Sequence, residues 1–286
     1  IECHRIMCHA ADAVLSGGIR RSAMICLFSL DDGEMMSAKT GNWYATDPWL
    51  ANANNSVVLK RDEVKEKQFR RVFGMIRQWG EPGFYFTDDY DYGTNPCCEI
   101  GLNPKLTVDA DIQAQLARRG VHAAIGETRT GWAFCNLCEI NAARLTSLDD
   151  FLAAAKAATL IGTLQATYTK MPYLGWVSEM LAERDALLGI GMTGMLDSPA
   201  VACDPRFQRT VAESIRTWNV EYAKRLGIRP AARTTCVKPS GTTSLELGCV
   251  ASGHHAHHAR RYIRRVTADE LEYVFQAFRA VNPHMC

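Results

Sequence analysis

The chain alternates between short apolar runs and longer stretches in which apolar residues recur every three or four positions. Residues 19–28 form an apolar run that predicts a strand, and residues 84–86 predict a second, shorter strand. Between them, residues 62–79 place four apolar side chains on one face of a helix and charged side chains on the other. Strands that alternate with long helices predict the α/β class.

Two later helices carry clear start and stop signals. Ser147 and Asp150 form a capping pair that predicts a helix running to about Tyr168. Asp204-Pro205 combines a capping side chain with a proline at the first helical position. We expect that helix to end at Gly227, because glycine readily takes the left-handed conformation that closes a helix.

Two further segments are less regular. Thr267 and Glu270 form a capping box ahead of apolar positions between 271 and 278, which predicts a helix near the end of the chain. Residues 103–132 are different, because the polar segment 109–119 has helical composition but no strong apolar stripe. We therefore interpret residues 103–132 as an inserted surface excursion.

Composition narrows the class of protein. The 286 residues are 47% hydrophobic and 22% charged, as in ordinary globular enzymes. A net charge of +1 gives no field for collecting nucleic acid or a membrane surface, and no apolar run approaches a membrane span. Eleven cysteines, an odd number, favour a reducing cytoplasm in which thiols are buried, catalytic or metal-bound. Because the first residue is Ile1, we expect the chain to be a piece of a longer protein.

The run of residues 94–100 carries the most specific chemistry. Asn95, Cys97 and Glu99 are spaced by two, so an extended loop would turn an amide, a thiol and a carboxylate toward one substrate. Pro96 suits a fixed loop better than the middle of a sheet. A further thiol, Cys135, follows downstream. A carboxylate base beside one thiol, with another thiol to follow, predicts chemistry that both abstracts and reduces.

This pairing of segments resembles the ribonucleotide reductases, and the resemblance extends over nearly the whole chain. Four more segments match the family in the family's order: residues 16–23, 53–57, 189–194 and 238–244. The doubled arginine after Gly17-Gly18, the run that begins at Lys238 and residues 261–266 are most similar to the adenosylcobalamin-dependent class. Within that class, the chain is most like the monomeric ribonucleoside-triphosphate reductases.

The resemblance implies a fold and an activity. The fold would be a ten-stranded α/β barrel, incomplete here at its N-terminus, with residues 1–286 forming part of that catalytic domain. The activity would be reduction of ribonucleotides to 2′-deoxyribonucleotides by a cysteine thiyl radical, for DNA precursor synthesis. It implies adenosylcobalamin as cofactor, a ribonucleoside tri- or diphosphate as substrate, and dNTP or ATP as effectors. A thioredoxin-like protein or another dithiol would be the reductant.

The resemblance also implies individual roles. Cys97 falls at the position of the thiyl radical that takes the 3′ hydrogen, and Glu99 at that of the base that accepts the 3′-hydroxyl proton. Asn95 matches an amide that hydrogen-bonds the sugar hydroxyls. Cys135 matches one member of a reducing pair whose partner lies upstream of residue 17 in the family. We therefore expect that this chain alone does not turn over.

Two loops are implied to bind ligands. A small-residue loop after a predicted strand at 234–237 would expose backbone N–H groups to an anion, and the resemblance assigns it to the substrate phosphates. An ordinary Ser/Thr turn is the alternative. The phosphate-binding residues are Ser240, Gly241, Thr242, Thr243 and Ser244. Gly17, Gly18 and Arg20 correspond to the loop that carries the effector signal, and the planar donors of Arg20 suit contact with substrate or effector.

Three other interpretations remain open. Residues 189–194 fit the dinucleotide pattern G-x-G-x-x-G, but Pro199 interrupts the helix that this pattern requires, so we favour close backbone packing. The histidines of residues 254–258 suggest a metal-binding protein, although structural histidines are favoured and no metal site is expected. The alternative functions are an inactive nucleotide-binding relic and an iron-dependent two-subunit reductase of the same superfamily.

Overall fold

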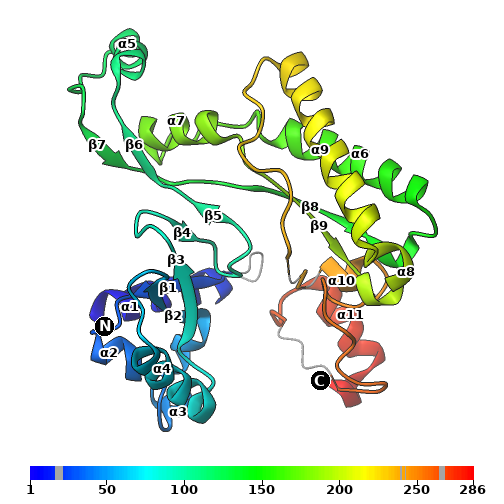
Figure 1. Ribbon diagram of the computed structural model, residues 1–286. Coiled ribbons are helices and arrows are strands. Elements are labelled where there is room, and N and C mark those ends of the chain that lie inside the picture. The colour runs from blue at the N-terminus through cyan, green and yellow to red at the C-terminus, as the bar shows by residue number, and fades with distance from the viewer. Residues whose placement is uncertain (17–21, 239, 242, 264–267) are drawn as a thin grey trace. The chain divides into compact units, whose positions relative to one another are not determined.

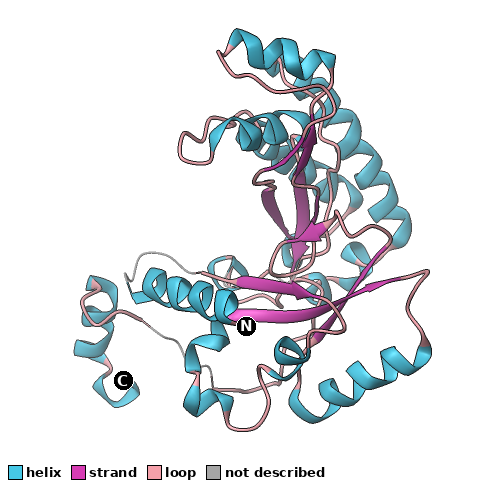
Figure 2. Cartoon of the chain, turned by 90° about the vertical axis from the view of Figure 1, so that its left-hand side faces the viewer, coloured by secondary structure: helices cyan, strands magenta, loops and turns pink. Residues whose placement is uncertain are grey.

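The computed structural model describes the whole chain except residues 17–21, 239, 242 and 264–267. It divides into a first unit, residues 1–90 with 261–286, and a second unit, residues 91–260. Helices and strands are mixed in both parts of the chain, which confirms the α/β class (Figures 1 and 2).

The first unit is built on three parallel strands in the order β1-β2-β3: β1 (Met24–Phe28), β2 (Ala53–Lys60) and β3 (Gly83–Thr87). Helix α1 (Glu2–Ser16) precedes them, and α4 (Glu66–Trp79) connects β2 to β3. The short helices α2 (Gly33–Ser37), α3 (Trp43–Thr46) and η1 (Pro48–Asn52) connect β1 to β2. A buried cluster beneath the sheet contains Phe28, Met35, Met36, Val57, Leu59 and Val72.

The structure confirms both strands predicted here and shortens two elements. The first strand begins at Met24, and the predicted positions 19–21 lie outside the described residues. Helix α4 begins at Glu66 rather than at residue 62, because Lys60 ion-pairs with Glu63 at 2.8 Å and residues 61–63 form a turn.

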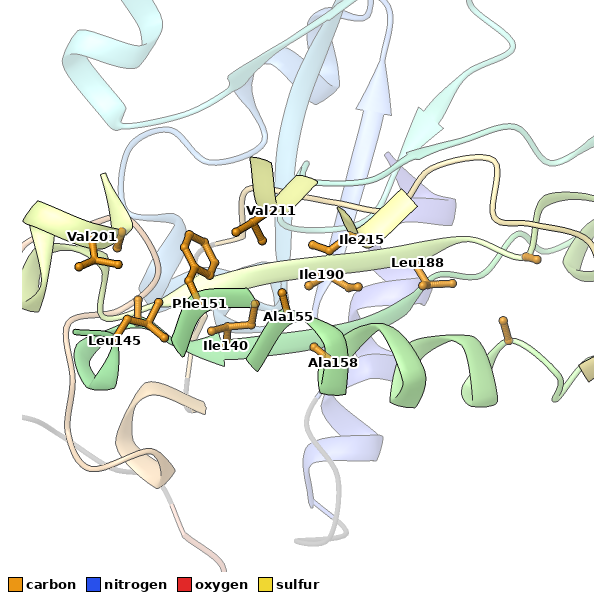
Figure 3. Packing of buried hydrophobic residues seen from close by; sticks show 14 residues of the cluster. Ile140, Leu145, Phe151, Ala155, Ala158, Leu188, Ile190, Val201, Val211 and Ile215 are labelled. Carbon is orange, nitrogen blue, oxygen red and sulfur yellow. The ribbon is translucent and has the colours of Figure 1, made fainter. Parts of the chain in front are cut away.

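The second unit is built on two parallel strands, β8 (Asn136–Asn141) and β9 (Leu188–Thr193). Helices α6 (Leu148–Gln165) and α9 (Pro205–Leu226) pack together against one face of this pair (Figure 1). Figure 3 shows the apolar layer between them, in which Ile140, Leu188 and Ile190 meet residues of both helices. This packing holds β8 and β9 in place against the two helices.

The caps of α6 and α9 confirm the sequence signals. The Ser147 hydroxyl accepts a hydrogen bond from the Asp150 backbone N–H at 3.1 Å, and the Asp204 carboxylate accepts one from the N–H of Arg206 at 2.8 Å. Gly227, with φ of 70°, ends α9. The strand predicted at residues 234–237 is reduced to a single bridge between Thr235 and Ile190.

The smaller elements of the second unit surround this sheet. The antiparallel pair β4 (Gly93–Thr94) and β5 (Gly101–Leu102) flanks the Cys97 loop. A second pair, β6 (Lys105–Thr107) and β7 (Thr128–Thr130), encloses α5 (Ala110–Arg118). Leu116 of α5 is fully buried in a cluster that includes Met180 and Leu181 of α7 (Gly175–Asp185). The interpretation of residues 103–132 as an insertion stays a prediction.

The remaining elements are η2 (Ala142–Arg144), η3 (Met195–Asp197), α8 (Pro199–Ala202), α10 (Thr243–Glu246), α11 (Tyr273–Val281) and η4 (Pro283–Met285). Helix α11 starts later than its capping box predicts: Glu272 is the N-cap and makes no capping bond with its side chain, and Thr267 lies outside the described residues. Within the described part of the chain, no helix is long and apolar enough to cross a membrane. The complete ten-stranded barrel stays a prediction, since the described parallel strands form one group of three and one of two.

Candidate active site

The Cys97 loop is a turn closed by its own hydrogen bonds. The N–H of Cys98 donates to the Asn95 carbonyl at 2.9 Å, and the N–H of Ile100 donates to the Asn95 side-chain oxygen at 3.1 Å. Cys98 takes the left-handed conformation, with φ of 61°. The expectation of an extended loop with three side chains on one side is therefore wrong, because the turn folds the Asn95 amide back onto its own backbone.

The turn separates the environments of Cys97 and Glu99. Cys97 is exposed, although neighbouring atoms partly desolvate its thiol; this desolvation and the Glu99 charge raise its pKa, while the Lys238 charge opposes them. Both carboxylate oxygens of Glu99 are buried, and neither has a hydrogen-bond partner among the described residues. A buried acceptor without a donor is costly, so this carboxylate is suited to receive a hydroxyl from a ligand.

Two more thiols lie inside the unit near Glu99. Burial raises the pKa of Cys135 to about 12, with smaller contributions from Cys236 and Glu99. Burial likewise raises the pKa of Cys236 to about 12, and the Glu99 charge is the next contribution. Sequence reasoning missed Cys236; its position two residues before Lys238, where the matching segment 238–244 begins, is the signal that could have found it.

The glycines of β9 leave room for Cys135 and Cys236. A Cβ atom on Gly189 would lie 2.5 Å from Leu137, 3.0 Å from the Cys135 sulfur and 3.1 Å from the Ile100 side chain. A Cβ on Gly191 would lie 3.3 Å from the Cys236 carbonyl oxygen. Strand β9 includes both glycines instead of preceding them, so the structure confirms close backbone packing and excludes a dinucleotide turn here.

A cavity of about 700 Å³ opens beside these groups. Cys98 and Glu99, rather than Cys97, supply the loop's part of its lining, and Cys236 and Lys238 line it from the segment after Thr235. Apolar side chains of β9 and α9 complete the walls. The volume lies within the range of about 300–1,000 Å³ that small-molecule sites occupy.

The predicted phosphate loop is only partly described. The Ser240 hydroxyl donates to the Glu139 carboxylate at 2.6 Å, and the Ser244 hydroxyl donates to the Gly241 carbonyl at 2.8 Å. Gly241 has φ of 62°, and Thr243 begins α10. Thr242 lies outside the described residues, as do Gly17, Gly18 and Arg20 of the predicted effector loop.

The histidine run forms no metal site in the described residues. Residues 254–258 are not helical, so the spacing that would gather them on one helix face does not apply. His257 instead pairs with Asp197, with 3.1 Å between Nε2 and Oδ1, and the rings of His254 and His255 lie 4.2 Å apart. Asp197 comes from a segment 60 residues earlier, which is why sequence reasoning found no acid for these histidines.

Known proteins are similar in sequence to most of this chain. No family model matches the chain. It is 24% identical over 297 residues to the adenosylcobalamin-dependent ribonucleoside-triphosphate reductase of Lactobacillus leichmannii, covering 94% of this chain and 38% of that protein. The reductase of the same name from Levilactobacillus brevis is 22% identical, with 98% of this chain and 39% of that protein covered. The chain thus spans about two fifths of the length of these curated relatives.

Solved structures agree on the fold. A crystal structure of a B12-dependent, class II ribonucleotide reductase matches with a TM-score of 0.57 and 21% identity, covering 82% of this chain and 34% of that chain. The class Id ribonucleotide reductase alpha subunit of Actinobacillus ureae matches with a TM-score of 0.56 and 13% identity. The match covers 94% of this chain and 54% of that subunit. In sequence, the chain is similar to part of reductases named as adenosylcobalamin-dependent, and its fold is similar to that of solved ribonucleotide reductases.

Proposed function

We propose that this protein reduces ribonucleotides to 2′-deoxyribonucleotides through a thiyl radical on Cys97, with adenosylcobalamin as its cofactor. The observation that carries the proposal is the buried, unpartnered carboxylate of Glu99, two residues from Cys97 and open to a nucleotide-sized cavity. The similarity of 94% of the chain to reductases of that name supports the choice of cofactor. The exposed Cys97 thiol fits a cofactor that must reach it from outside the protein core.

When bound, adenosylcobalamin would supply the radical chemistry, and Cys97 would be the residue that gives up its thiol hydrogen and becomes the thiyl. The Cys97 sulfur then takes the 3′ hydrogen of the ribose, which restores the S–H bond and leaves the radical on the sugar. Because S–H and activated C–H bonds have similar strengths, the same hydrogen atom can be returned at the end of the cycle. The turn closed by Asn95 fixes the position of this sulfur.

Glu99 acts as the general base in the proposed cycle. Its oxygens have no donor among the described residues, so the substrate 3′-hydroxyl can bind there and give up its proton as the 2′-hydroxyl leaves as water. The Asn95 oxygen already accepts a bond from Ile100, so its amide nitrogen is the atom that we propose for a sugar hydroxyl.

Cys135 contributes to the reducing step. Because burial raises its pKa to about 12, the thiol stays protonated at neutral pH and carries a hydrogen to deliver. In balance, one ribonucleotide and two thiols give one deoxyribonucleotide, one disulfide and one water. A thioredoxin-like protein or another dithiol then reduces the disulfide, in the cytoplasm where such reductants persist.

The proposal also assigns the ligand loops. Residues 240–244 would bind the tri- or diphosphate of the substrate, and Gly17, Gly18 and Arg20 would respond to dNTP or ATP effectors. Since the hydroxyls of Ser240 and Ser244 are bonded within the protein, backbone N–H groups are the donors that we propose for the phosphates.

The experiment gives the complete protein CTP or CDP, a dithiol and adenosylcobalamin, and measures deoxynucleotide together with exchange of the 3′ hydrogen. We expect Cys97→Ser to abolish both, and Cys135→Ser to abolish product while exchange continues. Cys203→Ser, at an exposed thiol outside the cavity lining, is the matched control and should keep both. Exchange that persists in Cys97→Ser would contradict the assignment of the radical.

A second class of reductase is supported by one observation. The class Id alpha subunit matches 94% of this chain in fold, against 82% for the class II structure. Product that forms only with iron and a separate subunit, and not with adenosylcobalamin, would favour that class. Nucleotide binding without turnover under either condition would instead identify an inactive relic.

A further inference from the structure

Glu139 on β8 joins two parts of the second unit that lie far apart in sequence. Its Oε1 lies 3.1 Å from the Lys238 ammonium, and its Oε2 accepts a hydrogen bond from the Ser240 hydroxyl at 2.6 Å. The side chain is only 5% exposed, and Ser240 is 101 residues away along the chain. A buried carboxylate therefore uses one oxygen for a cation and the other for a hydroxyl.

The contact crosses β9 at a glycine. Glu139 is paired in register with Gly191, and a Cβ atom on Gly191 would lie 3.7 Å from the Lys238 Cβ and 3.3 Å from the Cys236 carbonyl oxygen. The segment after Thr235 thus lies close over β9 because position 191 has no side chain. Glu139 can then reach that segment from the next strand.

The pair is not a free source of positive charge for a phosphate. The Lys238 charge is largely balanced by Glu139, and the Ser240 hydroxyl is already used as a donor. What the arrangement does instead is fix the residues that line the cavity, Cys236 and Lys238, and the start of the loop at residues 240–244. Because β8 begins directly after Cys135, the loop is fixed to the strand that the reducing thiol precedes.

We propose that Glu139 is a positioning residue that holds the phosphate-binding loop at the right distance from Cys97 and Glu99. The inference rests on the proposed function, since it assigns the loop to the substrate phosphates. Glu139 touches neither the substrate nor the reacting atoms and acts through Ser240 and Lys238. Loss of its contacts should weaken nucleotide binding equally in the ground and transition states, which raises KM and leaves kcat nearly unchanged.

The test compares Glu139→Gln with the unmodified complete protein. The glutamine keeps an acceptor for Ser240 but gives Lys238 no opposite charge. We expect the nucleotide KM to rise at least tenfold while kcat stays within threefold. Ser240→Ala should raise KM in the same direction, and the double variant should be more affected than either single variant, because the two substitutions remove different contacts of the same carboxylate.

The matched control is Glu81→Gln in the first unit. Glu81 pairs with the buried Lys39 at 2.9 Å, so its loss should cost stability in a similar way, yet the nucleotide KM should not change. An equal rise in KM in both variants would mean that Glu139 has only a structural role. An unchanged KM in a folded, active Glu139→Gln protein would also overturn the proposal; if that variant fails to fold, Ser240→Ala decides instead.

Binding of inorganic tripolyphosphate separates this inference from the proposed function. Calorimetry on the complete protein should show at least tenfold weaker binding in Glu139→Gln and no change in Glu81→Gln. If the unmodified protein forms no deoxynucleotide, the proposed function fails, and the tripolyphosphate comparison still decides the role of Glu139. Equal affinities in the two variants would refute that role.

Discussion

Replacing Gly189 with alanine should destabilise the second unit by overpacking the contacts of β9 with Leu137, Cys135 and Ile100. The new Cβ would lie 2.5 Å from Leu137, which no real Cβ contact tolerates, and 3.0 Å from the Cys135 sulfur. Leu137 must therefore move, and the sulfur and the Ile100 side chain at 3.1 Å leave little space for it. Overpacking of this kind costs about 1–3 kcal/mol. Removing a glycine from a strand stabilises the chain by roughly 0.5–1 kcal/mol, so we expect a net loss of roughly 1 kcal/mol from the middle of the two ranges, and of about 2.5 kcal/mol at most.

Hydrogen exchange in increasing urea measures this loss within the second unit. The Ile190 N–H donates to the Thr234 carbonyl at 3.0 Å, so its exchange reports the opening of β9. With a urea slope of about 2 kcal/mol per molar, the midpoint should fall by roughly 0.5 M. Gly101→Ala is the control in the same unit, because a Cβ there would meet nothing within 4 Å.

If Gly189→Ala keeps the midpoint of the unmodified chain, the contacts of β9 with Leu137, Cys135 and Ile100 are not as tight as described. If Gly101→Ala loses as much stability as Gly189→Ala, the effect belongs to glycine replacement in general and not to this site.

Three further predictions concern charge and thiol chemistry. At pH 8 a thiol with a pKa of about 12 is a thiolate in about one molecule in ten thousand, so mass spectrometry should find Cys97 alkylated well before the half-buried Cys135 and Cys236; simultaneous labelling of all three would contradict the raised pKa of the last two. Since the Lys238 charge lowers the pKa of Cys97, Lys238→Met should move the alkylation profile of Cys97 to higher pH, and a shift to lower pH would reverse the assigned sign. Asp204→Ala should lower the urea midpoint at pH 7, because the folded chain depresses the pKa of Asp204 to about 2, chiefly through its bond to Arg206. That contribution to stability is present above the unfolded pKa of about 3.9 and is lost as the pH falls toward 2. The urea midpoints of the unmodified chain and of Asp204→Ala should therefore converge over this range. Asp204→Asn should keep part of the stability, because asparagine can still cap the helix.

The helices that sequence predicts best are those with local signals. The cap at Ser147 and the limits of α9 at Asp204 and Gly227 depend on neighbouring residues, and the structure confirms them. Helix α5 shows the opposite case. Its segment has no strong apolar stripe, yet Leu116 is fully buried because Met180 and Leu181 come from a helix about sixty residues later.

In the candidate site too, residues that are adjacent in sequence could be predicted and long-range contacts could not. The motif around Cys97 and Glu99 is readable because its residues are adjacent, but the turn that separates them depends on bonds from the backbone to the side chain and carbonyl of Asn95. Glu139 was not predicted, because its partners stand about a hundred residues away. Long-range pairing of this kind leaves no periodic trace in one sequence.

The unpartnered carboxylate of Glu99 makes one part of the cavity lining unfavourable for anions and favourable for hydroxyl groups. An anionic group placed beside it would meet another negative charge in a poorly solvated space, whereas a hydroxyl would find an acceptor there. A molecule with a phosphate at one end and a diol at the other can therefore bind in only one orientation, with its diol toward Glu99. The orientation of such a molecule is then set by repulsion as much as by attraction.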